Sequence, residues 1–300
     1  MLALGGGVAY LSEPLNPYAP GPLISLTPTH QFQYISSENE RRFLKPFQSL
    51  VALKYPWMNE VAALRAPRDV RRVLRRSRRL AQVSTKSPRP LLKDPFAFFS
   101  IPWFIERLAC TPVVVVRHPA AVASSMKRLG WVFDFNNLLA QPLLMDGLLA
   151  PYRREIEALS RAPTDSVTHA GVLWRIIYGT LRGFADELGN LLVVRHEALS
   201  SSPVEQFEHL SRSLGLHFDG ATAEQIRGFT DERNPPELDQ AQPHSVRVNS
   251  RASLWNWQRR LTSEEIKVVR EATEGVVELY YPGFESDPSL LALYPEGSAR

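Results

Sequence analysis

Val113-Val-Val-Val116-Arg117-His118-Pro119-Ala-Ala-Val-Ala-Ser-Ser125-Met126 is the stretch from which we predict the fold of this chain. The four valines form a short β-branched run, which is typical of a strand that is buried on both faces. Pro119 is suited to begin a helix, because proline fits the first helical position. A buried strand followed at once by a helix predicts an α/β fold with a mainly parallel sheet.

Three further apolar runs are expected to be strands: Val8–Leu11, Pro90–Lys93 and Leu191–Val194. Charged or turn-forming residues follow each run. Polar groups should therefore gather at the carboxyl ends of the strands, which is the edge where open α/β sheets bind ligands.

Helices are expected where apolar residues recur at helical spacing, as they do between 172 and 188. Ser202 is expected to cap a helix that begins at Pro203, and Thr262 to form a capping box with Glu265. The polar segment 231–253 separates these helices and is expected to be a long loop. Loops of that length in a compact domain are usually functional.

The composition excludes several classes of protein. With 300 residues, of which 44% are hydrophobic and 22% charged, the chain is neither disordered nor collagen-like nor a small disulfide scaffold. The single cysteine, Cys110, excludes an internal disulfide and a multi-cysteine zinc site. No run approaches the roughly 18 to 20 apolar residues that span a bilayer. The start of the chain lacks the basic leader of a signal peptide, so we predict a cytoplasmic protein.

The net charge of +4 conceals one basic segment, because eight arginines and one aspartate lie between 65 and 79. Three interpretations are open. The segment is a solvated amphipathic helix beginning at Pro67, it captures an acidic acceptor such as a glycan or a lipid head group, or it binds nucleic acid through phosphates. Because no aromatic residues interleave the arginines and no nucleic-acid motif occurs, no nucleic acid is expected as a partner.

Arg117 and Ser125 are the candidate phosphate ligands. A guanidinium at a strand end offers paired donors, and the following helix adds positive potential at its N-terminus and a hydroxyl two turns on. The alternative is that Arg117 pairs with a core carboxylate and Ser125 merely packs. The spacing alone favours neither interpretation.

Arg117-His-Pro119 with Ser125 resembles the 3′-phosphate motif of sulfotransferases that use 3′-phosphoadenosine 5′-phosphosulfate (PAPS). Four other segments are similar to the family in the same order: Tyr10–Pro17, Leu91–Pro95, Val194–Ser200 and Arg251–Trp257. The resemblance covers roughly Val8 to Tyr280. It implies one sulfotransferase-like domain over 1–300, folded as a P-loop-like three-layer sandwich with a central parallel sheet.

The resemblance also implies the binding residues. Arg117, Ser125, Arg251 and Ser253 would bind the nucleotide, with the 231–253 loop covering it, and Arg247 is an alternative to Arg251. No metal is required. The family's 5′-phosphosulfate loop follows its first strand, and this strand and loop are not seen ahead of Val8. Gly5–Gly7 is no substitute, because it precedes a strand. We therefore expect the chain as given to be weakly active or inactive.

Glu13 and Lys93 are the candidate catalytic residues that the resemblance implies. Glu13 would take the proton of the acceptor, and Lys93 would neutralise the departing bridging oxygen. The alternative for Glu13 is a solvated acid that caps the following turn. Asp94 is a rival base or a partner that orients Lys93. Pro95 stands where some sulfotransferases have a catalytic histidine, which favours Glu13.

The function expected from this resemblance is transfer of a sulfuryl group from PAPS to a hydroxyl or amine of a small-molecule or glycan acceptor. The competing hypothesis is a non-catalytic relic that binds the nucleotide or a polyanion. A P-loop kinase is less favoured, because no Gly-x-x-x-x-Gly-Lys-[Ser/Thr] motif occurs. Either an acceptor pocket or, as is more common, the core accounts for six aromatic residues: Trp57, Phe96, Phe98, Phe99, Trp103 and Trp131.

Overall fold

A computed structural model describes residues 1–19, 21–86, 89–161, 165–189, 191–237 and 247–282 of the chain. The fold is mixed α/β and mostly helical, with short parallel strands. The chain divides into two compact units, which are described separately. Unit 1 comprises Pro112–Phe135 and Pro151–Arg300 together with Met1, and unit 2 comprises Leu2–Thr111 and Asn136–Ala150.

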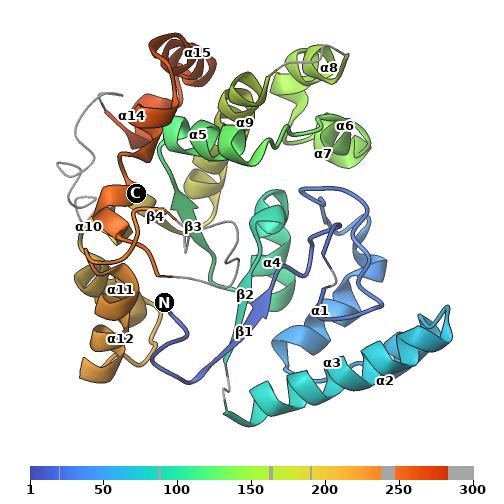
Figure 1. The fold of residues 1–300 in the computed structure, drawn as a ribbon. Helices are drawn as coiled ribbons and strands as arrows, with labels where there is room; N and C mark the ends of the chain where they lie inside the picture. The colour runs from blue at the N-terminus through green and yellow to red at the C-terminus, as the bar shows by residue number, and fades with distance from the viewer. Residues whose placement is uncertain (20, 87–88, 162–164, 190, 238–246, 283–300) are drawn as a thin grey trace. The chain divides into compact units, whose positions relative to one another are not determined.

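Unit 2 is built around two parallel strands, β1 (Val8–Ser12) and β2 (Arg89–Lys93) (Figure 1). The register pairs Val8 with Arg89 at one end and Ser12 with Lys93 at the other. The helical elements of this unit are η1 (Glu40–Arg42), α1 (Leu44–Val51), α2 (Trp57–Ala62), α3 (Pro67–Lys86), η2 (Pro95–Ser100), α4 (Ile101–Leu108), α6 (Asn136–Leu139) and α7 (Pro142–Asp146).

The core of unit 2 joins the inner face of β1 to α1 and α4. Phe47 on α1 packs edge-on against Phe104 on α4, with ring centroids 4.9 Å apart, and against Trp103 at 5.8 Å. Leu11 of β1 and Leu80 of α3 belong to the same cluster. Burial of these side chains stabilises the unit, because apolar burial contributes roughly 25 cal/mol per Å².

Unit 1 also contains one parallel pair, β3 (Val113–Val116) and β4 (Leu192–Arg195), with Val113 opposite Leu192. Its helices are α5 (Pro119–Leu129), α8 (Arg153–Arg161), α9 (Ser166–Glu187), α10 (His196–Ser201), α11 (Pro203–Ser213), α12 (Gly220–Thr230), α13 (Ser250–Ser253), α14 (Asn256–Arg260), α15 (Ser263–Thr273) and α16 (Val277–Tyr280). The 3₁₀ turn η3 (Ala150–Tyr152) joins the two units.

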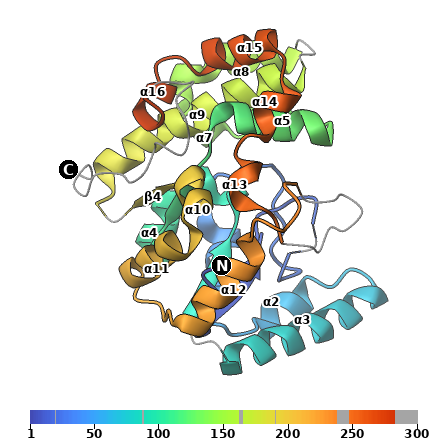
Figure 2. The ribbon, with the colours of Figure 1, turned by 60° about the vertical axis from the view of Figure 1, so that its left-hand side comes forward.

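Packing of α5, α9 and α15 on one another forms the helical layer of unit 1. Both views show α5 beside α14 and α15 (Figure 1, Figure 2). Gly171 of α9 permits the close approach of α15, because a Cβ added there would lie 2.8 Å from the Cβ of Ala272. Helix α5, which carries Ser125, packs against both α9 and α15.

All four strands predicted from the sequence are confirmed, each within one residue at either end. The capping box of Thr262 and Glu265 is also confirmed, whereas Ser202 takes the N-cap position of α11 without a side-chain hydrogen bond. Among the described residues the strands pair as two separate two-stranded sheets. A single central sheet is not seen, and the P-loop-like sandwich remains a prediction.

Within the described ranges, none of the helices combines the length and apolar character that crossing a bilayer requires.

Candidate active site

Arg117 directly follows β3, where the strand and α5 hold its backbone. Its carbonyl oxygen accepts a hydrogen bond from the indole N–H of Trp174 on α9 at 2.8 Å. The side-chain Nε is buried and has no hydrogen-bond partner. Within the described chain no hydrogen bond or ion pair reaches the rest of the guanidinium either, so its donors remain available to an external anion.

Glu197 is the core carboxylate with which Arg117 would pair in the alternative interpretation. It is buried at 2% exposure, and both of its oxygens are already bonded. Oε1 accepts from the backbone N–H of His118 at 2.9 Å, and Oε2 accepts from the hydroxyl of Tyr281 at 2.6 Å. The carboxylate lies close enough to influence Arg117 electrostatically, yet it forms no ion pair with it.

The electrostatics of Arg117 are those of a desolvated cation. Burial lowers the pKa of its guanidinium, and the negative charge of Glu197 counteracts part of that shift. The nearby guanidinium of Arg260 lowers the pKa further. An arginine in this state stays protonated, because its ordinary pKa is above 12. A bound anion would relieve the cost of burying the charge.

His196 opens α10 and lies beside Arg117. Burial, with an added contribution from the charge of Arg117, lowers the pKa of His196 to about 4. Its Nδ1 lies 3.5 Å from the hydroxyl of Ser200. The imidazole is therefore neutral at pH 7. The sequence pattern implies no role for His196, and its position beside the guanidinium is evident only in the folded chain.

Ser125 is on α5, two turns into the helix as expected, and it is half-buried. Its hydroxyl has no hydrogen-bond partner within the described residues. The preceding residue, Ser124, accepts a hydrogen bond at 2.5 Å from Arg260, the same residue that influences Arg117. Arg260 thus lies near both Arg117 and the serine pair of α5.

Arg260 is the site residue that sequence reasoning missed. Arg260 is the last residue of α14, forms an ion pair with Glu237, and its side chain is only 22% exposed. Arg128 of α5 pairs with the same carboxylate at 3.1 Å. The signal available in the sequence was its place just before the capping box at Thr262, but position alone does not tell an inward arginine from an outward one.

The predicted nucleotide-covering residues lie on or beside the short helix α13. Arg251 donates to the carbonyl of Ser201 at 2.9 Å and lies 3.7 Å from Glu232. The hydroxyl of Ser253 donates to the carbonyl of Ser250 at 2.7 Å. Both are thus engaged locally. Residues 238–246 of the predicted covering loop lie outside the described residues. Arg247, which is the next residue of the loop, is exposed.

Glu13 and Lys93 meet at the ends of β1 and β2 in unit 2. The backbone N–H of Glu13 donates to the carbonyl of Lys93 at 2.7 Å, which extends the strand pairing by one step. Their side chains form an ion pair, and Asn16 donates to the other carboxylate oxygen at 2.7 Å. Glu13 takes a positive φ of 46°, a conformation that non-glycine residues seldom adopt.

Several effects set the pKa of Glu13. Burial alone would raise it, but the hydrogen bonds from Lys93 and Asn16 and the charge of Lys93 together bring it below its ordinary value. Glu13 is thus ionised at neutral pH, which is the state that a general base requires. Release of Lys93 from the pair would strengthen Glu13 as a base.

Asp94 holds the adjacent loop and caps η2. It accepts hydrogen bonds from the backbone N–H of Leu15 and, at 2.9 Å, from that of Phe96. Burial raises the pKa of Asp94 to about 6 even though these two amide bonds oppose the shift. Its oxygens bond to backbone rather than to Lys93, so a structural role fits Asp94 better than a role in orienting that lysine.

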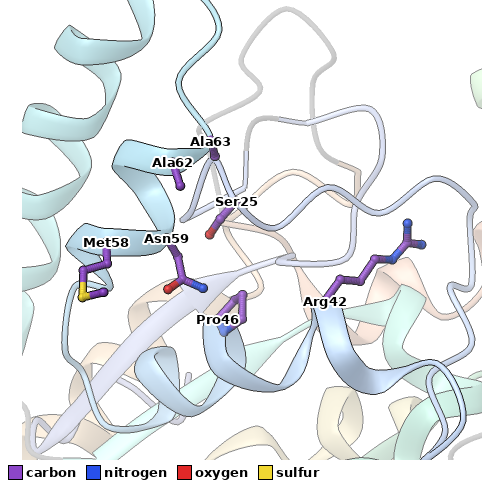
Figure 3. Close-up of a pocket in the computed structure, with 7 residues that line it drawn as sticks. All are labelled: Ser25, Arg42, Pro46, Met58, Asn59, Ala62 and Ala63. Carbon is purple, nitrogen blue, oxygen red and sulfur yellow. The ribbon is translucent and has the colours of Figure 1, made fainter.

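The aromatic residues considered for an acceptor pocket are mostly core. Phe96, Phe98, Phe99 and Trp103 are buried at 9% exposure or less, whereas Trp57 and Trp131 are 49% and 36% exposed. Figure 3 shows an open pocket elsewhere in unit 2, lined by Ser25, Arg42, Pro46, Met58, Asn59, Ala62 and Ala63. Neither Glu13 nor Lys93 lines it.

The described residues contain no group of three or more His, Cys, Asp or Glu side chains arranged to hold a metal ion. Cys110 is a free, half-buried thiol whose pKa burial raises to about 11. No model of a known protein family matches the chain, and no curated protein matches it either. The case for its function therefore depends on its own residues.

Proposed function

We propose that this chain is a PAPS-dependent sulfotransferase that acts on a hydroxyl or amine of a small-molecule or glycan acceptor, within a P-loop-like sandwich fold. The observation that carries the proposal is the guanidinium of Arg117, which is desolvated yet has no protein partner. Leaving such a donor group unsatisfied costs about 1–3 kcal/mol, and a phosphate on the 3′ position of the nucleotide would recover that cost.

The remaining nucleotide ligands of the proposal are those that the family resemblance implies. Ser125 offers an unengaged hydroxyl on the helix after Arg117, while Arg251 and Ser253 belong to the segment that would cover the nucleotide. Arg260 adds a second cation near Arg117. Positively charged groups of this kind hold phosphates at helix N-termini and strand ends. We also propose a cytoplasmic location, because the free thiol of Cys110 is compatible with the reducing conditions there.

In the proposed reaction the acceptor oxygen or nitrogen attacks the sulfur of PAPS. A new bond forms to sulfur, and the bond between sulfur and the 5′-phosphate oxygen breaks. Glu13 takes the proton of the acceptor, and Lys93 neutralises the charge on the departing oxygen of adenosine 3′,5′-bisphosphate. In the free protein these two side chains neutralise each other, which keeps Glu13 deprotonated until the donor charge attracts Lys93 away.

Calorimetric titration of adenosine 3′,5′-bisphosphate tests the binding half of the proposal. Arg117→Ala should weaken the affinity by about tenfold to a hundredfold, since a charge-assisted hydrogen bond contributes roughly 1.5–3 kcal/mol. The matched control is Arg182→Ala, which removes an exposed arginine that is paired with Asp186. Equal affinity of the Arg117 variant and the unchanged protein would reject the phosphate role.

The catalytic half is tested by sulfate transfer in a chain extended at its N-terminus with the strand and phosphate loop that the resemblance calls for. Glu13→Gln should lower the transfer rate by roughly 10²–10⁴, the usual contribution of a general base. Near-normal transfer would remove Glu13 from that role. Tight nucleotide binding with no transfer in the extended chain would favour the non-catalytic relic instead.

A further inference from the structure

Helix α3 presents an arginine face that the rest of unit 2 does not neutralise. In the part of α3 whose side chains are described, the buried residues share one helical face: Asp69, Val73, Ser77 and Leu80, with exposed fractions of 7%, 3%, 8% and 6%. The opposite face carries exposed arginines at Arg68, Arg71, Arg72, Arg75, Arg78 and Arg79. The 20-residue helix is therefore anchored to the unit by one edge, with its basic face directed to solvent.

The arginines of this face lack the acidic partners that arginines have elsewhere in the chain. Within the part of the chain that the structure describes, only Arg72 of this face forms an ion pair, with Asp69 at 3.2 Å. Arg76, beside this face, is half-buried and lies toward the carboxylate of Glu60. By contrast, four exposed arginines on other helices each pair with an acid three or four residues away: Arg161, Arg182, Arg212 and Arg227.

The spacing of the unpaired arginines makes them repel one another. Arg71, Arg75 and Arg79 follow at four-residue intervals, so their side chains are neighbours on the helix surface. Like charges at this spacing cost the isolated helix a few tenths of a kcal/mol per pair. An anionic surface laid along the helix would remove this repulsion, whereas solvent only screens it.

Exposed apolar side chains occur on α3 itself and on the preceding helix α2. Val70 and Leu74 are one turn apart on α3 and remain 46% and 45% exposed. On the preceding helix α2, the exposed apolar residues are Trp57 at 49%, Met58 at 86% and Val61 at 56%. Figures 1 and 2 show α2 beside α3. Helix α3 supplies the arginines with exposed Val and Leu side chains, and α2 supplies exposed Trp, Met and Val side chains. Together the two helices have the composition of interfacial membrane-binding segments.

We propose that α2 and α3 dock unit 2 onto an anionic lipid bilayer. The arginines would contact phosphate head groups, and Val70, Leu74 and the exposed side chains of α2 would enter the boundary with the acyl chains. The apolar component favours a membrane over a nucleic acid, because contacts to nucleic-acid phosphates are electrostatic, whereas a bilayer also accommodates exposed apolar side chains. This proposal does not depend on the sulfotransferase assignment.

The test is cosedimentation of the full chain with vesicles of phosphatidylcholine alone and of phosphatidylcholine containing a quarter phosphatidylserine. Binding should be confined to the anionic vesicles and should weaken as salt is added, because salt screens charges over about 8–10 Å. R71Q/R75Q/R78Q/R79Q should lower the partition coefficient by several hundredfold, since each arginine near an anionic surface contributes a factor of about 5. Glutamine preserves helix propensity, so the helix should persist by circular dichroism.

Matched control variants distinguish a specific effect of the docking face from a general effect of removing charge or apolar side chains. R161Q/R182Q/R212Q/R227Q removes the same charge from arginines that are already paired and should leave binding unchanged. V70S/L74S should weaken binding at least tenfold, whereas V132S/L279S, at exposed fractions of 45% and 44%, should not. The proposal is overturned by equal binding to both vesicle types, by equal losses in the variants and their controls, or by tight binding of a DNA duplex with none of the vesicles.

Discussion

Tyr281 donates its hydroxyl to Glu197 at 2.6 Å, and both side chains are buried. The two residues are 84 positions apart in the chain. With the backbone N–H of His118 on its other oxygen, Glu197 has both oxygens hydrogen-bonded without the help of Arg117. The buried carboxylate is thereby held by neutral donors, and the adjacent guanidinium keeps its donors for a ligand.

Tyr281→Phe should weaken anion binding at Arg117 indirectly, through Glu197. Removing the hydroxyl leaves Glu197 short of one donor, and Arg117 is the nearby group able to supply it. We expect a severalfold loss of affinity for adenosine 3′,5′-bisphosphate by calorimetry, together with a loss of about 1–3 kcal/mol in the free energy of unfolding. Tyr18→Phe, at a site 73% exposed, is the control and should change neither quantity.

His196 should make the protein less stable in acid. Its pKa is about 4 in the folded chain, against an ordinary 6.5. The unfolded chain therefore binds the proton first as pH falls, so stability is full above pH 6.5 and decreases toward pH 4, by up to about 3 kcal/mol. Chemical denaturation across this range should show that slope, and His196→Gln should flatten it. His209→Gln, at an exposed position of α11, is the control and should leave it intact.

The same histidine reports on the proposed ligand. Because the charge of Arg117 contributes to the low pKa of His196, a bound anion should raise that pKa. Titration of the imidazole by NMR with and without adenosine 3′,5′-bisphosphate measures the change. An unchanged pKa at saturating ligand would place the anion away from Arg117.

Lys93→Met should raise the pKa of Glu13. Burial already acts in that direction, and the lysine supplies both a hydrogen bond and a positive charge that oppose it. Methionine keeps the apolar stem of the side chain and removes the charge. The carboxyl carbon of Glu13, followed by NMR against pH, should titrate at higher pH in the variant. Lys54→Met in the same unit is the control, and an equal shift there would show that the effect is not local.

Two glycines of α9 should respond to alanine with opposite signs. At Gly171 the new Cβ would lie 2.8 Å from the Cβ of Ala272, so α15 must move. Thermal or chemical denaturation should show a loss of about 1–3 kcal/mol, the usual cost of overpacking. Gly183 has nothing within 4 Å, so Gly183→Ala should gain up to about 1 kcal/mol from helix propensity. Equal effects at the two positions would contradict the close contact between the helices.

The local elements could be predicted from the amino-acid sequence. The valine run predicted β3 because β-branched side chains restrict the backbone over a few residues, and the capping box placed the start of α15 because its partners are three residues apart. Ser125 fell two turns into its helix for the same reason. Each of these features depends only on residues that are close in the chain.

Which charges are neutralised depends on long-range contacts that appear only in the folded chain. Lys93 meets Glu13 across 80 residues, Tyr281 reaches Glu197 across 84, and Arg260 approaches α5 from the far end of the chain. The division into two units, each with its own strand pair, also arises from such long-range contacts. Local sequence patterns do not encode these pairings, because the energy of a buried charge depends on neighbours that only the folded chain brings within reach.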